Sequence, residues 1–290
     1  MDRISVRKLP FRTILMSLLL LLALVMVWLS PPQAAANQRF MVFLPLISSP
    51  PEAEPERLPT NWIERVNAYR ALAGVPPVSE DATLNENCQQ HARYVAENRH
   101  LTHSQDTSRP WASPEGQHCA QRGNVWIGYS GIWEPYQTID SWMHSVGHRL
   151  WLLYPTTSAV GYGFYSNNGS SGAAMDILSR ANMDADSAYN GWPVRYPEAE
   201  QRNVPPIAMP ISLQWPYFDA APILTSSQLR TASGTAISHE ATTNLPSRHK
   251  GIVLTPDTNL PPNTTIEVQV QGSYLGQAFD LRWSFATGEE

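Results

Sequence analysis

Three stretches of the chain carry apolar residues three or four positions apart, which predicts helices that each bury one face. Their apolar positions are Trp62, Ile63, Val66, Tyr69 and Ala73, then Leu84, Cys88, Ala92 and Val95, then Ile139, Trp142, Met143 and Val146. His91 shares the second apolar face and is expected to be a hydrogen-bonded core histidine. The third helix is expected to end at Gly147, because glycine enters the left-handed region without strain, so His148 would emerge just past a helix end.

Runs with strand character follow these helices. Residues 159–165 and 173–178 alternate or run apolar, and together with the helices they predict an α+β domain built as an α-β-α sandwich. Residues 189–210 are rich in proline and polar residues and are expected to form a connection. Beyond it, short apolar runs recur between Pro, Asn and Gly, and two of them, 266–270 and 281–285, alternate apolar and polar residues. Short strands of this kind predict a small all-β sandwich.

The N-terminus has the pattern of an export segment. Residues 1–13 are basic and polar, residues 14–29 are apolar except for Ser17, and Ala34-Ala35-Ala36 offers small residues for cleavage. The apolar run is shorter than the roughly twenty residues that span a bilayer comfortably, so we expect cleavage after Ala36, with a permanent membrane anchor as the alternative. Either outcome makes the protein secreted or extracytoplasmic, with membrane contact only through an uncleaved N-terminal segment.

Composition and charge limit the classes of function. Of the 290 residues, 42% are hydrophobic, which is enough for ordinary cores. The proline clusters divide the chain into an export segment (1–36), a proline-rich linker (37–60), a first domain (61–188) and a second domain with its leading connection (189–290). The net charge is -5 and no basic stripe is present, so nucleic acid is not expected as a partner.

Cys88 and Cys119 are the only two cysteines. In an oxidising compartment they are expected to form a disulfide that ties the second helix to the loop before Gly123 and contributes about 2–4 kcal/mol. The alternative is two separate thiols, with Cys88 as a small core residue. No local Cys-His pattern indicates a catalytic cysteine.

A series of short motifs points to a known family. In chain order they are Asn67 to Val78, Gln90-His91-Ala92, Leu101-Thr102-His103-Ser104, Arg122-Gly123-Asn124, Ser141 to Pro155, and Val160-Gly161-Tyr162-Gly163-Phe164. This order resembles the CAP superfamily (cysteine-rich secretory proteins, antigen 5 and pathogenesis-related 1, with its SCP-like domain) in its bacterial, secreted form. The resemblance covers roughly residues 60–185. It implies the same α-β-α sandwich, with a cleft formed by two histidines and two acidic residues from different segments.

The resemblance assigns His103 and His148 to the two histidines. The first acid normally stands in a Gly-Glu-Asn motif, where this chain has Arg122-Gly123-Asn124, and the second falls near Ser145, so the chain departs from the family pattern at both acids. The family binds a divalent metal at the histidine pair, which implies a Zn²⁺ site here with His103 and His148 as ligands. The cleft residues predicted in this way are His103, Asn124, Trp126, Ser145 and His148.

Three functions are open on this basis. The leading one is an exported ligand-binding or interaction protein whose partner is an apolar small molecule, a lipid or a component of the cell envelope. The resemblance also allows a metal-dependent, peptidase-like hydrolase that uses His103 and His148, although a hydrolytic zinc site generally needs a third ligand and a carboxylate. A structural envelope component is the third. A serine hydrolase is not favoured, because the sequence after Gly128 lacks the second glycine of a nucleophile elbow.

Two further features bear on binding. The aromatic residues Trp111, Trp126, Tyr129 and Trp133 either pack the loops around the cleft or stack on a ligand. The C-terminal stretch Trp283-Ser284-Phe285-Ala286-Thr287-Gly288 resembles the last strand of bacterial immunoglobulin-like modules. Such modules commonly serve as spacers or adhesive units, and no residue there indicates chemistry.

Overall fold

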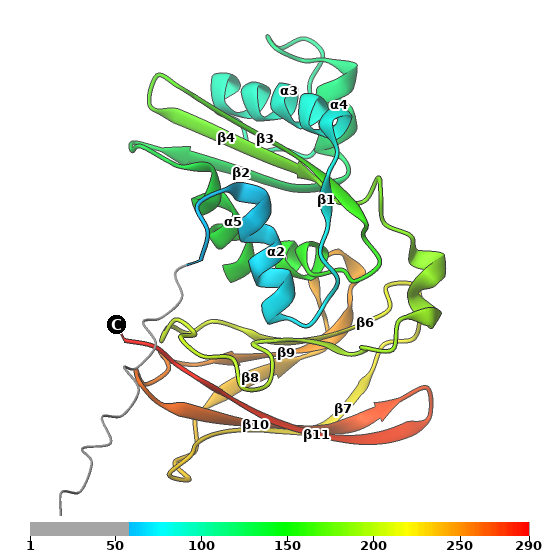
Figure 1. Cartoon of the computed structure of the whole chain (residues 1–290), viewed down its shortest axis with the longest axis vertical. Helices are drawn as coiled ribbons and strands as arrows, with labels where there is room; N and C mark the ends of the chain where they lie inside the picture. The colour runs from blue at the N-terminus through cyan, green and yellow to red at the C-terminus, as the bar shows by residue number, and fades with distance from the viewer. Residues whose placement is uncertain (1–57, 290) are drawn as a thin grey trace, which may run out of the picture. The chain divides into compact units, whose positions relative to one another are not determined.

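A four-stranded sheet lies at the centre of the N-terminal half of the described chain, which covers residues 58–289 of this computed structural model. The strand order is β1-β3-β4-β2, with β1 parallel to β3 and the other neighbours antiparallel. The strands are β1 (Ser79–Glu80), β2 (Gly123–Tyr129), β3 (Ala159–Asn167) and β4 (Ser170–Asp176). β2 is therefore an edge strand along its whole length (Figure 1).

Helices lie on both faces of this sheet. Figure 1 shows α3 and α4 above it and α2 and α5 below it. The helices are α2 (Trp62–Leu72), α3 (Ala82–Asn98), α4 (Pro114–Ala120), α5 (Pro135–His144) and α6 (Val146–Leu152), followed by the 3₁₀ helix η2 (Met183–Ala188). The mixture of helix and sheet agrees with the predicted α+β class.

Glycines let α3 approach the sheet closely. A Cβ built on Gly161 or Gly163 of β3 would collide with the backbone of α3 around Leu84 and Gln89, and one on Gly172 of β4 would collide with Ala92 O. The Gly-Tyr-Gly stretch of the sequence is thus explained by helix–strand packing rather than by a turn.

Two polar residues of α2 hold the following chain segments. Asn67 pairs with Val78 in both directions, donating from Nδ2 to its carbonyl (2.9 Å) and accepting its N–H (2.8 Å). Arg70 is buried and donates to the carbonyl oxygens of Pro76 (2.7 Å) and Leu152 (2.8 Å), so its charge is satisfied by backbone dipoles. Burial lowers the pKa of the Arg70 guanidinium to about 10, which leaves it charged at neutral pH.

The C-terminal half consists of two facing sheets. Their orders are β11-β10-β7 and β5-β6-β9-β8. The strands are β5 (Val194–Tyr196), β6 (Ile211–Trp215), β7 (Ile223–Thr231), β8 (His239–Thr242), β9 (Lys250–Pro256), β10 (Thr265–Tyr274) and β11 (Gln277–Ala286), with the 3₁₀ turn η3 (Pro246–Arg248) before β9. Trp215 of one sheet contacts Tyr274 and Phe279 of the other at ring-centroid distances of 5.6 Å. An all-β unit is present, and its immunoglobulin-like character stays a prediction.

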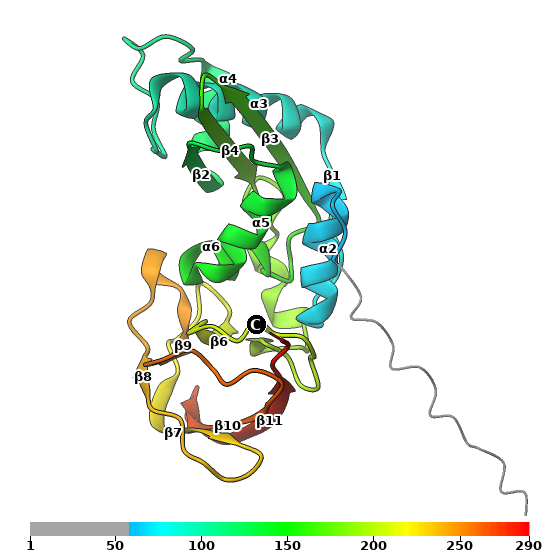
Figure 2. The ribbon, with the colours of Figure 1, turned by 90° about the vertical axis from the view of Figure 1, so that its left-hand side faces the viewer.

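The outer face of the β5-β6-β9-β8 sheet packs against α6. Leu150 of α6 forms an apolar cluster with Leu245 and Val253. Arg149 is buried and donates from its guanidinium to the carbonyl oxygens of Met143 (3.1 Å) and Pro210 (2.6 Å). α6 therefore follows the N-terminal half in sequence and lies between that half and the C-terminal sheet, as Figure 2 shows.

Some predictions lie outside the described residues. The export segment at 1–36 and almost all of the proline-rich linker at 37–60 fall there. Within residues 58–289 no helix combines the length and the apolar character that crossing a bilayer would require. The predicted boundary at residue 189 lies within one continuous apolar cluster that includes Tyr69 and Tyr196, and the division into domains stays a prediction.

Candidate functional site

The helix that was expected to end at Gly147 is broken earlier. α5 ends at His144, Ser145 has an extended backbone (φ -99°, ψ 121°), and α6 begins at Val146. Gly147 and His148 thus lie in the first turn of α6, and the prediction of a helix end at Gly147 was wrong. Gly147 allows close packing instead, because a Cβ there would lie 3.2 Å from Cβ of Pro246.

His148 is held by the turn that breaks the helix. Its Nδ1 lies 2.9 Å from Oγ of Ser145. Burial lowers the pKa of His148, and the charge of His103 lowers it further. His148 is therefore neutral at pH 7, and the two imidazoles are near enough for their charges to interact.

His103 is anchored through the same ring atom. Its Nδ1 lies 3.0 Å from the carbonyl oxygen of Ala120, and only an N–H can be shared with a carbonyl, so the ring donates there. This bond makes Nε2 of neutral His103 the unprotonated nitrogen. Neither Nε2 of His103 nor Nε2 of His148 has a hydrogen-bond partner within residues 58–289.

Asn124 connects β2 to α6. It is buried, and its Nδ2 donates to the backbone carbonyl of His148 at 3.1 Å, while its Oδ1 has no partner in the described part of the chain. Asn124, Ser145 and His148 are thus in one hydrogen-bonded group. Trp126 lies two residues further along β2 and packs edge-to-face on Trp133 (5.1 Å), with no recorded contact to either histidine.

The acids that the family pattern leads one to expect are absent at both places. A Cβ on Gly123 would collide with the carbonyl oxygen of Met175, because Gly123 pairs closely with β4, so the strand requires glycine there. The other place is near Ser145, whose hydroxyl contacts His148. Glu134 precedes α5 as its N-cap residue. Among the described residues, no group of three or more His, Cys, Asp or Glu side chains is arranged to hold a metal ion.

Sequence reasoning missed how the His103 loop is supported. His91 is buried, as predicted, and its Nε2 donates to the carbonyl of Thr102 (2.9 Å) while its Nδ1 accepts from Nε2 of Gln105 (3.0 Å). Gln105 Oε1 in turn accepts the N–H of Ser113 (2.7 Å). His91 and Gln105 therefore fix the segment that carries His103. No local pattern marks Gln105, because its partners are eight and fourteen residues away.

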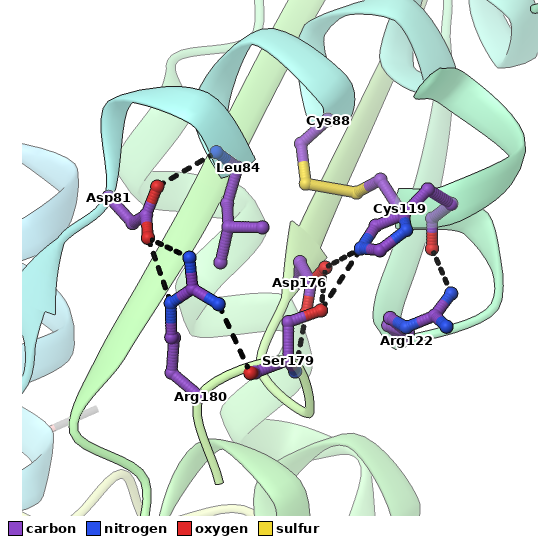
Figure 3. A network of polar contacts seen from close by, with 9 residues as sticks. Asp81, Leu84, Cys88, Cys119, Arg122, Asp176, Ser179 and Arg180 are labelled. Atoms are coloured by element: carbon purple, nitrogen blue, oxygen red, sulfur yellow. Dashed lines mark hydrogen bonds and ion pairs between the residues drawn. A yellow bond between two sulfur atoms is a disulfide. The ribbon is translucent and has the colours of Figure 1, made fainter. Parts of the chain in front are cut away.

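The predicted disulfide is confirmed, since Cys88 of α3 is bonded to Cys119 of α4 (Figure 3). Both cysteines are buried with Ala174 of β4 beneath them. The residue after Cys119 is Ala120, whose carbonyl anchors His103. The disulfide thus helps to fix the position of one of the two histidines.

A second polar cluster lies beside the disulfide. Nε2 of His118 is 3.1 Å from Oγ of Ser179 and 3.5 Å from Oδ2 of Asp176, and Ser179 donates to Asp176 at 2.7 Å (Figure 3). A Ser-His-Asp catalytic relay needs the two ring nitrogens of the histidine to face serine and aspartate separately. Here one nitrogen faces both groups, and burial raises the pKa of Asp176. This cluster joins α4 to the chain after β4 and is not arranged for acyl transfer.

Comparison with known families gives one match, over residues 63–179. Residues 63–179 match the model of the cysteine-rich secretory protein family, CAP. This part of the chain is similar to a CAP domain. The match spans all the residues that the sequence analysis assigned to the cleft, from His103 to His148.

Two solved structures are similar to the chain. One is an extracellular protein containing an SCP domain from Bacillus anthracis str. Ames, at 17% identity and a TM-score of 0.31, with 40% of this chain and 38% of that one covered. The other is an outer surface protein from Borrelia burgdorferi, at 15% identity and a TM-score of 0.29, with 39% of this chain and 85% of that one covered. The matched region thus spans well under half of the Bacillus protein. No curated protein matches the sequence.

Proposed function

We propose that the chain is an exported CAP-domain protein that binds a ligand or partner outside the cytoplasm through a cleft lined by His103 and His148. The observation that carries the proposal is the way in which both imidazoles are held, each through its Nδ1 atom. Each uses Nδ1 for a protein contact and has Nε2 without a partner in the described residues. An imidazole that carries its proton on Nδ1 has an unprotonated Nε2, which would accept a hydrogen bond from a ligand or bind a divalent transition metal.

Zn²⁺ fits this pair only as a two-ligand contact. Backbone and hydroxyl partners at Nδ1 orient the rings as they commonly do in metal sites, which favours the proposal. Hydrolytic zinc sites, however, have three protein ligands and a carboxylate that moves a proton. The described residues offer no such group, so we derive no hydrolytic step through a metal. Binding is therefore favoured over the metal-dependent hydrolase, and a purely structural envelope role is the outcome if nothing binds.

The chemistry of the surroundings bears on the ligand. Trp126 and Trp133 lie on and beyond the strand that carries Asn124, and such rings offer apolar surface to a small molecule, a lipid or an envelope component. We further propose that the C-terminal sandwich is an immunoglobulin-like spacer. Export itself is proposed from the basic and then apolar pattern of residues 1–36.

Zinc-dependent stabilisation tests the two-histidine site. We expect ZnCl₂ to raise the melting temperature of the protein, because a ligand that binds only the folded state stabilises it by about 2.7 kcal/mol at one hundred times its Kd. The variants His103→Ala and His148→Ala should lose this response, and His100→Ala, at an exposed position, should keep it. Native mass spectrometry of the purified protein would reveal a co-purifying metal or apolar ligand. A protein that carries no ligand and does not respond to zinc or chelator would contradict the proposal.

A further inference from the structure

The two ends of β2 reveal which of its backbone groups point away from the sheet. Before the strand, the N–H of Ile177 donates to the carbonyl of Arg122 (2.9 Å), and after it, the N–H of Ser130 donates to the carbonyl of Gly169 (3.1 Å). The register between β2 and β4 is continuous, one residue to one. In an antiparallel pair, residues alternate between bonding to the partner and facing away. Even-numbered residues from 122 to 130 therefore bond to β4, and odd-numbered ones face outward.

The outward-facing residues are Gly123, Val125, Ile127 and Tyr129. Within residues 58–289, only one of their backbone groups has a hydrogen-bond partner outside the strand. This group is the carbonyl of Val125, which accepts a hydrogen bond from Nε1 of Trp142 at 3.3 Å. The amides and carbonyls of Ile127 and Tyr129 have no partner outside the ladder in this described part of the chain. The second half of this edge strand thus presents a row of unused donors and acceptors.

Exposed apolar side chains lie beside that half of the strand. Tyr129 is 47% exposed, and Ile132, three residues later, is 92% exposed. The hydroxyl of Tyr129 donates to the carbonyl of Arg99 at 3.2 Å, and Leu101, two residues after Arg99, is 54% exposed. Apolar side chains and unpaired backbone groups therefore occur together at one end of β2.

We propose that this edge accepts an extended peptide as a fifth strand of the β1-β3-β4-β2 sheet. Ile127 and Tyr129 would pair with its backbone, and Tyr129, Ile132 and Leu101 would contact its apolar side chains. An extended peptide offers alternating C=O and N–H groups at the spacing that this row requires, and strand addition is a common mode of peptide recognition. A lipid chain would leave the same backbone groups without partners. The site does not involve the imidazoles of His103 and His148 and goes beyond the function proposed above.

Amide exchange at β2 tests this proposal. The probe is a mixture of ten-residue peptides without proline in which apolar and polar residues alternate, added to the full chain. We expect the amides of Ile127 and Tyr129 to exchange at least tenfold more slowly with the peptides present, while that of Gly128, already bonded to β4, changes little. The matched control mixture is N-methylated at every residue, which removes the donors on both edges of each peptide, and it should give no protection.

Two kinds of variant separate this site from the histidine cleft. Ile127→Pro removes an outward N–H and no bond to β4, and proline is tolerated at such edge positions, so peptide binding should weaken at least tenfold in a folded protein. Ile127→Val is its control and should bind normally. His103→Ala and His148→Ala should also bind the peptides normally. If Ile127→Pro does not fold, the N-methylated mixture still decides.

Three results would overturn the proposal. The first is that amide exchange at Ile127 and Tyr129 is unchanged at millimolar peptide. The second is that these amides are also protected by the N-methylated mixture. The third is that the protein dimerises through β2 in the absence of peptide. Sedimentation would detect the last of these, which would mean that a second copy occupies the edge.

Discussion

The two edges of the β1-β3-β4-β2 sheet differ in how their backbone groups are satisfied. At the β3 edge, β1 pairs with Ala159 and Val160, and beyond it the side chains of Asn85 and Gln89 accept the N–H groups of Tyr162 (2.7 Å) and Phe164 (3.1 Å). At the β2 edge, by contrast, the one outward hydrogen bond found in residues 58–289 is the bond from the indole of Trp142 to the carbonyl of Val125. One edge is closed by a strand and two amides, and the other is largely open.

This difference indicates where the domain interacts. An open edge invites unwanted pairing, and proteins commonly cover or shorten such edges. The closed edge shows that α3 supplies side chains for this purpose at β3. β2 instead begins beside the two histidines, with Asn124 bonded to His148, and ends beside exposed apolar residues. The open edge and the candidate site thus lie on the same strand.

The largest effect is expected at Arg149, on the helix that flanks the open edge. Arg149→Met should lower the free energy of unfolding by about 3 kcal/mol, because one buried and one partly buried carbonyl lose their charged donor and α6 loses its link to Pro210. Chemical denaturation monitored by fluorescence measures this. Arg180→Ala is the control, since its ion pair with Asp81 is half exposed and should contribute less than about 1 kcal/mol. Equal effects of the two changes would contradict the burial argument.

Acid should weaken the packing behind α6. His249 is buried between Trp151 (4.3 Å) and Tyr217 (5.5 Å), and burial lowers its pKa to about 4. Because the unfolded chain takes up this proton near pH 6.5 and the folded protein only near pH 4, stability should fall as the pH drops through that window. The loss is up to about 3 kcal/mol.

His249→Phe keeps a ring in this place and removes the proton. The variant should therefore lose less stability between pH 6.5 and 4 than the unmodified protein. Urea denaturation at several pH values provides the measurement. His91, whose pKa burial also lowers to about 4, contributes separately, so His249→Phe should reduce the acid sensitivity without abolishing it. Identical pH profiles for the two proteins would be evidence against the role of His249.

A smaller effect is expected at the closed edge. Asn85→Ala should lower the free energy of unfolding by about 1–2 kcal/mol and speed amide exchange at Tyr162, whose N–H loses its acceptor. Gln89→Ala, at an exposed side chain, should cost less, because water can replace the amide beside Phe164. If neither variant changes backbone amide exchange in β3, the side chains of Asn85 and Gln89 do not close this edge, and the contrast with β2 fails.

The smallest expected effect is a change in the pKa of one residue of the histidine pair. His103→Gln should raise the pKa of His148, because it removes a like charge that disfavours protonation of His148. NMR titration of the His148 ring measures this shift directly. His100→Gln, remote from the contacts of His148, should leave the titration unchanged. An unaltered His148 pKa in His103→Gln would mean that the two rings do not share one site.

Much of the local structure follows from the sequence. The apolar periodicities predicted α2, α3 and α5, and the alternating runs predicted β10 and β11, because residues that bury one face of an element recur with its period. Residues 189–210 were expected to be a connection, yet β5 forms within them, because its three residues pair with β6. Such pairing depends on distant chain segments and leaves little local pattern.

What the sequence determined by itself was the order of motifs and the disulfide partners, since these depend on residue identity and on a pairing that two cysteines allow in one way. The assignment of His103 and His148 to a site stays a prediction. Tertiary structure decided the rest. It broke the helix at Ser145, required glycine at Gly123 through contact with β4, and left one edge of the sheet open while closing the other. The physical reason is that these features depend on backbone approach and hydrogen bonding between segments far apart along the chain, which no local pattern of residues records.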